Sequence, residues 1–159
     1  MEILKYLLIL SLPIIALFIS KKYSAFVDSI LERARGYYLF LCHIERMLGS
    51  YLTPPHRLGD GFSHPSLEDM MIRISAGDSL IDAYRACRGA LPSSVDETLT
   101  EFFSDFGKGD VSLELRRVRE AISRIDAALS VEGAEGEKQK KICSVIAPSL
   151  AIGLVIWMI

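Results

Sequence analysis

The chain has 159 residues, half of them hydrophobic, with a mean hydropathy of +0.30 and a formal net charge of −2 at pH 7. This length leaves room for one hydrophobic core once the apolar ends are set aside, and the near-neutral charge gives no electrostatic argument for nucleic-acid binding. Three widely spaced cysteines, Cys42, Cys87 and Cys143, contain no CxxC pair, which indicates reduced cytoplasmic thiols rather than a disulfide framework.

The N-terminal segment has the length and composition of a membrane span. Residues 3–20 contain one charge, Lys5, in 18 residues. As a helix they reach ~27 Å, close to the hydrocarbon thickness of a bilayer. We therefore expect an N-terminal transmembrane anchor over residues 1–22. A cleaved secretory signal is the alternative, but Glu2 lies near Lys5, no Ala-x-Ala site follows, and the pair Lys21–Lys22 is typical of a stop.

A long helix is predicted to follow the first anchor. Apolar residues recur in steps of four and three from Tyr23 to Tyr51, which places them on one stripe of a helix that faces a partner helix. The stripe comprises Tyr23, Val27, Ile30, Ala34, Tyr37, Leu41, Ile44, Leu48 and Tyr51. The sequence Thr53-Pro54-Pro55 predicts the end of this helix, because proline lacks a backbone donor and restricts the residue before it.

Shorter helices are predicted in the middle of the chain. Three serines are each followed by an acid three positions later, the pattern of an N-terminal capping box. The pairs are Ser66 and Asp69, Ser79 and Asp82, and Ser94 and Glu97. Gly107 and Gly109 are predicted to end the third of these helices, and Asp110 is placed to cap the last helix of the chain.

The last helix carries a second stripe and a second apolar end. The stripe comprises Val111, Leu115, Val118, Ile122, Ile125 and Leu129. Gly133 and Gly136 interrupt it, either as a flexible joint or as a weak helical stretch. Residues 142–159 contain no charge, which predicts a C-terminal transmembrane helix over residues 139–159, with a buried core helix as the alternative. The expected fold is all-α: an antiparallel helical bundle over residues 23–138, flanked by two transmembrane helices.

The distribution of lysines predicts the orientation in the cell membrane. Lys21 and Lys22 follow the first predicted span, and Lys138, Lys140 and Lys141 precede the second. Because Lys and Arg beside a span stay on the cytoplasmic side, we expect the helical domain to be cytoplasmic and both termini to lie outside.

No pattern of catalytic or metal-binding residues is recognisable in the sequence. His43, His56 and His64 match no zinc spacing, and no P-loop, GxGxxG or GxSxG motif occurs. We therefore expect a non-catalytic protein without a cofactor.

Two groups of residues are candidates for binding a partner. Arg116, Arg117 and Arg119 form a basic cluster that could bind an acidic partner surface or anionic lipid; the alternative is a solvated face on which Glu120 pairs with Arg116 and Arg124. The second group is aromatic and is either a partner pocket or part of the core. It comprises Phe102, Phe103 and Phe106.

The layout and three short motifs resemble the stage III sporulation protein AB family. Residues 101–114, EFFSDFGKGDVSLE, are similar to that family's phenylalanine–glycine turn, which leads through glycine and aspartate into the last helix. Residues 51–54, YLTP, resemble the end of the family's first long helix, and the basic approach at residues 138–141 into an apolar terminus is also similar.

This resemblance implies a specific role. Members of the family are made in the mother cell of endospore-forming bacteria and help to build a transenvelope channel to the forespore. Their helical domain is similar to the cytoplasmic domains of the type II secretion platform protein F. The implied partners are other sporulation channel membrane proteins and a cytoplasmic secretion-type ATPase, with a homo-oligomer possible. A membrane-anchored helical adaptor or regulator unrelated to sporulation is the alternative.

Overall fold

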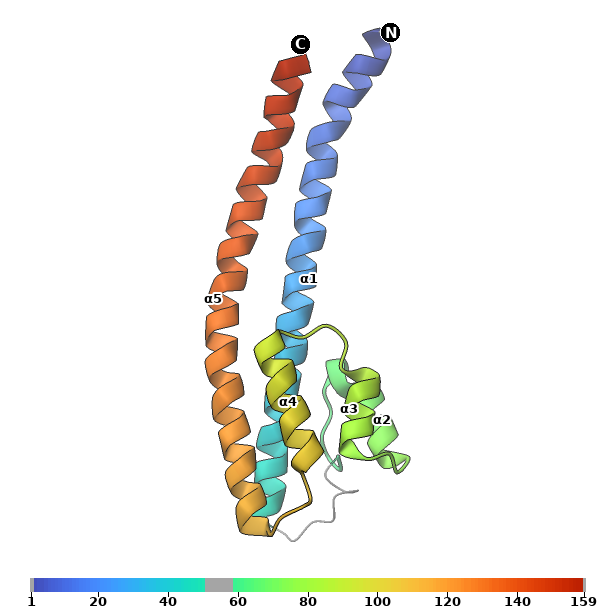
Figure 1. Ribbon diagram of the computed structural model, residues 1–159. Coiled ribbons are helices and arrows are strands. Elements are labelled where there is room, and N and C mark those ends of the chain that lie inside the picture. Colours follow the sequence, from blue (N-terminus) through green and yellow to red (C-terminus); the bar gives the residue numbers. More distant parts are fainter. Residues whose placement is uncertain (1, 51–58, 159) are drawn as a thin grey trace. The chain divides into compact units, whose positions relative to one another are not determined.

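The computed structural model describes the backbone of residues 2–50 and 59–158. These residues form six helical segments and no strand, so the all-α prediction is confirmed for this part of the chain (Figure 1). In order, the segments are α1 (Glu2–Ser50), the short 3-10 helix η2 (Pro65–Leu67), α2 (Glu68–Ser75), α3 (Leu80–Cys87), α4 (Ser93–Asp105) and α5 (Val111–Met158). The predicted helix end at residues 53–55 lies outside the described residues, as does His56.

The chain divides into two compact units. Unit 1 comprises Met1–Ser29 and Gly133–Ile159, and unit 2 comprises Ile30–Glu132. Both α1 and α5 contribute residues to each unit. The division in α5 falls next to Gly133, yet the helix continues through both Gly133 and Gly136. The glycines therefore do not break the helix.

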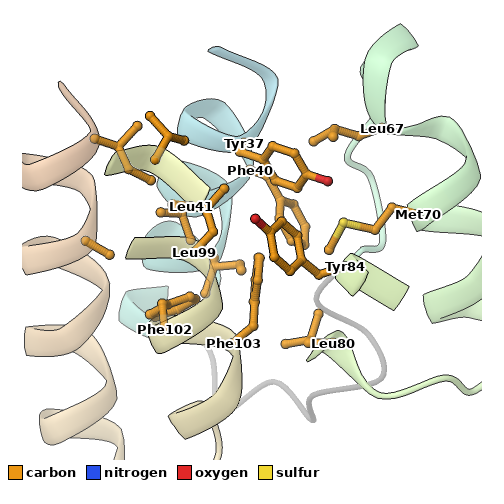
Figure 2. Close-up of a cluster of buried hydrophobic side chains, with 14 of the residues drawn as sticks. Tyr37, Phe40, Leu41, Leu67, Met70, Leu80, Tyr84, Leu99, Phe102 and Phe103 are labelled. Atoms are coloured by element: carbon orange, nitrogen blue, oxygen red, sulfur yellow. The ribbon is translucent and has the colours of Figure 1, made fainter. Parts of the chain in front are cut away.

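Unit 2 contains the hydrophobic core, which draws side chains from all of its helices (Figure 2). The predicted stripe on α1 is confirmed where it enters this unit, since Ala34, Tyr37, Leu41 and Ile44 are fully buried. On α5, Val118 and Ile125 are buried as predicted, together with Ala121, whereas Leu115 and Ile122 are half-buried. Burial of each large apolar side chain contributes about 1.5–3 kcal/mol, so this cluster is the main source of stability.

Within unit 2, α1 and α5 run antiparallel. Glu45 of α1 pairs with Arg119 of α5 at 2.6 Å. In Figure 1 the sequence colours of α1 and α5 advance in opposite directions along this unit. Helix α4 lies alongside both, and α3 packs between α4 and α2 (Figure 1).

One of the three predicted capping boxes is confirmed, and two helices begin elsewhere. Ser79 caps α3, where its hydroxyl accepts a hydrogen bond from the Asp82 N–H at 3.2 Å. The prediction for Ser66 was wrong: Pro65 starts a 3-10 turn earlier, and the ring of His64 accepts from the Ser66 N–H. The prediction for Ser94 was also wrong, because α4 begins at Ser93 directly after Pro92.

The predicted membrane spans gain no direct support from the fold. Searched over the described residues, no helix is both long and apolar enough to cross a membrane. Many residues of the two predicted spans lie outside those whose side chains the structure describes, among them 3–10 and 154–159. The spans, and the domain boundaries at residues 22 and 138, stay predictions.

Candidate partner-binding surface

The turn between α4 and α5 determines where the candidate arginines point. Gly107 supplies a positive φ of 84°, which suits a glycine after a helix end. Asp110 then caps α5 as predicted: one carboxylate oxygen accepts from the Leu113 N–H at 3.0 Å, and the other from the Ser112 hydroxyl at 2.8 Å. These hydrogen bonds, with the nearby charge of Arg116, lower the pKa of Asp110 below its usual value.

The Arg117 side chain forms its contacts with the α4–α5 turn and is not free to bind a partner. Its guanidinium donates to the backbone carbonyl of Asp105 at 3.0 Å and to Glu114 at 3.2 Å. The side chain of Glu114 is 5% exposed and that of Arg117 is 33% exposed. Because the pair is mostly desolvated and also bonded to the backbone, Arg117 stabilises the α4–α5 connection.

The remaining arginines of α5 extend toward different neighbours. Arg119 reaches Glu45 of α1, and Arg124 reaches Glu101 of α4 at 2.8 Å. The predicted pairing of Arg124 with Glu120 is therefore replaced by a contact to another helix. Arg116 is exposed and lies near the charge of Asp110. The three candidate arginines thus do not form one continuous basic surface, and the structure neutralises two of them.

Two of the three candidate phenylalanines belong to the core. Phe102 and Phe103 are 6% and 3% exposed, and Phe103 contacts the ring of Phe40 on α1 with a centroid distance of 6.4 Å. Phe106 is half-buried and lies against Phe102 at 5.3 Å. Of the two roles that the sequence left open, the structure supports packing for Phe102 and Phe103.

A shallow hollow lies between α4 and α5 in unit 2, with about 380 Å³ of space including the part open to solvent. Its lining includes Arg117 and Phe102, two of the predicted residues. The other lining residues are Thr98, Glu101, Asp105, Glu120, Ala121 and Arg124. Three carboxylates and two guanidinium groups give this surface mixed charge, which suits a polar protein surface better than a simple anion. Glu101 and Asp105 were not among the residues singled out from the sequence, because they lie on α4 and come near Glu120 of α5 only in the folded chain.

The histidines and cysteines of the described residues do not form a metal site. No group of three or more His, Cys, Asp or Glu side chains lies close enough to hold a metal within the described chain. His43 packs against the ring of Phe62 at a centroid distance of 5.5 Å, and His64 caps η2. The three cysteines are free thiols, and burial raises the pKa of Cys42.

Comparison of the chain with protein-family models, with curated proteins and with solved structures found no match.

Proposed function

We propose that this chain is a non-catalytic, membrane-anchored assembly component of a secretion-like complex: the mother cell–forespore channel required for endospore formation. One observation gives the proposal its main support. A single charged helical domain is bordered on both sides by segments of 18 residues with one charge or none. Such segments match the thickness of a bilayer. The three motifs that resemble the stage III sporulation protein AB family favour the sporulation channel over other membrane-bound complexes.

The internal organisation of unit 2 is consistent with a scaffold. Several hydrogen bonds and ion pairs around the α4–α5 turn cap a helix or join two helices. In this proposal the helical domain is a bundle like the cytoplasmic domains of the secretion platform protein F. It faces the cytoplasm of the mother cell, and its partners are other channel membrane proteins and a secretion-type ATPase.

The surface proposed for these partners is the mixed-charge hollow of α4 and α5 together with Arg116. Glu120 and Arg116 are exposed, and neither forms an ion pair within the described residues. Both charges are therefore available to a second protein. Polar complementarity of this kind directs specificity and association rate more than raw affinity.

The proposal is tested by deleting the gene in the organism that makes the protein and scoring heat-resistant spores. Tagged protein is then recovered in detergent from sporulating cells and its partners are identified by mass spectrometry. We expect loss of spores and recovery of a secretion-type ATPase with other sporulation membrane proteins. Normal spore numbers, or synthesis only in growing cells, would contradict the proposal and favour the unrelated adaptor.

A matched pair of variants tests the surface. Glu120→Lys reverses a charge in the hollow, and Asp69→Lys makes the same reversal on an exposed position of α2. Both should accumulate to the wild-type level. We expect only Glu120→Lys to reduce partner recovery. Equal recovery for both variants would exclude the hollow as the binding surface.

A further inference from the structure

Unit 1 has a polar connection between α1 and α5. The Tyr23 hydroxyl donates to the side-chain carbonyl of Gln139 at 2.9 Å. The ammonium of Lys140 pairs with Asp28 of α1 and, at 2.9 Å, with Glu137 of its own helix. The side chain of Lys140 is only 15% exposed, so two carboxylates hold it in place and neutralise its charge.

An open groove lies beside this connection, and its lining is basic and rich in hydroxyl groups. From α1 it is lined by Leu17, Ser20, Lys21 and Ser24, and from α5 by Lys140, Lys141 and Ser144. Both helices therefore contribute a lysine whose charge is not already paired. Neither Lys21 nor Lys141 forms an ion pair within the described residues, while the nearby Asp28 and Glu137 are occupied by Lys140.

The hydroxyl groups of the groove add hydrogen-bond donors. Ser144 donates to the backbone carbonyl of Lys141 at 2.8 Å. Within the part of the chain that the structure describes, the hydroxyls of Ser20 and Ser24 have no such partner. Two free ammonium groups beside two free hydroxyls are suited to a phosphate group.

Exposed apolar side chains continue from this groove along both helices. Leu17 lines the groove and is 58% exposed, Phe18 is 63% exposed, and Val145 on α5 is 64% exposed. Lys22 lies over the Phe18 ring at 5.7 Å, a contact typical of an amphipathic boundary. The ligand that fits therefore has an anionic head and an apolar tail.

We propose that this groove of unit 1 binds the phosphate headgroup of an anionic phospholipid. Lys21 and Lys141 supply the charge, Ser20 and Ser24 donate hydrogen bonds, and the acyl chains follow Leu17 and its apolar neighbours. The inference rests on the membrane location in the proposed function. It assigns lipid recognition to these lysines rather than to the arginines of unit 2, of which Arg117 and Arg119 are already paired.

The test uses the full chain in detergent and fluorescent phosphatidylglycerol, with binding followed by anisotropy. The variant is Lys21→Gln with Lys141→Gln. The control, Lys22→Gln with Lys138→Gln, removes the same charge from lysines outside the groove lining. Since each basic residue near anionic lipid contributes about 1 kcal/mol, partly screened, we expect the groove variant to bind at least about tenfold more weakly. The control should change affinity by no more than about threefold.

Equal weakening in the two variants would overturn the inference, because it would indicate general surface charge. Competition by free glycerol phosphate as strong as that by the lipid would also overturn it, in favour of a soluble phosphate. Circular dichroism must show the same helix content in both variants. A second variant, Ser20→Ala with Ser24→Ala, should weaken binding without any change in charge; unchanged affinity would exclude the assigned hydrogen bonds.

Alkaline carbonate extraction of cell membranes separates this inference from the proposed function. If wild-type protein is released by carbonate, the membrane-anchored function fails. If it stays in the membrane while the groove and control variants bind lipid equally, only the lipid site fails. Retention in the membrane with selective loss of lipid binding supports both.

Discussion

The carboxylate of Glu114 accepts a hydrogen bond from the backbone N–H of Gly109 at 2.9 Å, five residues earlier in the chain. The same oxygen accepts from Arg117, and the whole carboxylate is nearly buried. Gly109 permits this approach, since a Cβ there would lie 2.6 Å from the Leu113 side chain and 3.1 Å from the Glu114 oxygen. The entry into α5 is therefore held by a glycine, a buried acid and a half-buried arginine.

Replacement of Glu114 by alanine should destabilise the domain by about 3 kcal/mol. It leaves the Gly109 N–H unsatisfied and Arg117 without its carboxylate. Urea denaturation of the fragment 23–138, which contains all of unit 2, measures the free energy of unfolding. Glu120→Ala is the matched control on the same helix and should change it by less than about 0.5 kcal/mol. A loss for Glu114→Ala as small as that for the control would contradict the role of this contact.

Gly36 should be intolerant of even one methyl group. A Cβ at this buried position of α1 would lie 2.8 Å from Nδ1 of His64, the atom that accepts from the Ser66 N–H. Gly36→Ala must therefore displace His64 and its cap, at a cost of about 1–3 kcal/mol. At Gly133, where nothing lies within 4 Å, the same change should stabilise the helix by about 0.5–1 kcal/mol. Thermal melts of the two variants should shift in opposite directions, and shifts of the same sign would refute this packing.

Asp110 should make the stability of the domain depend on pH in the acidic range. Its pKa is lowered in the folded state, so the ionised carboxylate contributes stability above the ordinary aspartate pKa, and that contribution is lost as the pH falls through the folded value. Asparagine caps a helix comparably but does not ionise. The advantage of wild type over Asp110→Asn should therefore shrink between about pH 5 and about pH 2.

Denaturation curves of the two proteins across this pH range provide the measurement. Ser112→Ala removes one hydrogen-bond donor to the carboxylate and should reduce the pH dependence without abolishing it. A difference between wild type and Asp110→Asn that stays constant with pH would show that the charge of Asp110 contributes nothing.

Loss of the hydroxyl group should destabilise the domain at one of two core tyrosines but not at the other. The rings of Tyr37 and Tyr84 meet edge to face at 5.4 Å (Figure 2), and burial raises the pKa of both. The Tyr84 hydroxyl donates to the Asp96 carboxylate, whereas the buried Tyr37 hydroxyl has no partner among the described residues. Tyr84→Phe should cost about 2 kcal/mol, and Tyr37→Phe should be neutral or stabilising by up to about 1 kcal/mol. Urea denaturation of both variants measures the change in the free energy of unfolding. A larger loss of stability for Tyr37→Phe than for Tyr84→Phe would contradict these roles of the two hydroxyl groups.

Local sequence patterns correctly predicted the buried stripe of α1 and the cap of α5. The stripe through Tyr37 and Leu41 was recognisable because a helix repeats every 3.6 residues, and the cap at Asp110 because an aspartate followed two glycines. Ser66 and Ser94 had the same local signal, but a neighbouring proline fixed the start of each helix elsewhere.

By itself the sequence determined the all-α class, the two apolar ends and the helix stripes, since each depends on residue type and spacing along one element. Only the tertiary structure decided that Arg117, Arg119 and Arg124 are paired with acids in three directions, because their partners include Glu45 and Glu101 on other helices. The groove lined by Lys21 and Lys141 is likewise formed only in the folded chain, by residues of two helices. Lys21 and Lys141 are 120 positions apart in the chain and line one groove only because α1 and α5 run side by side in unit 1.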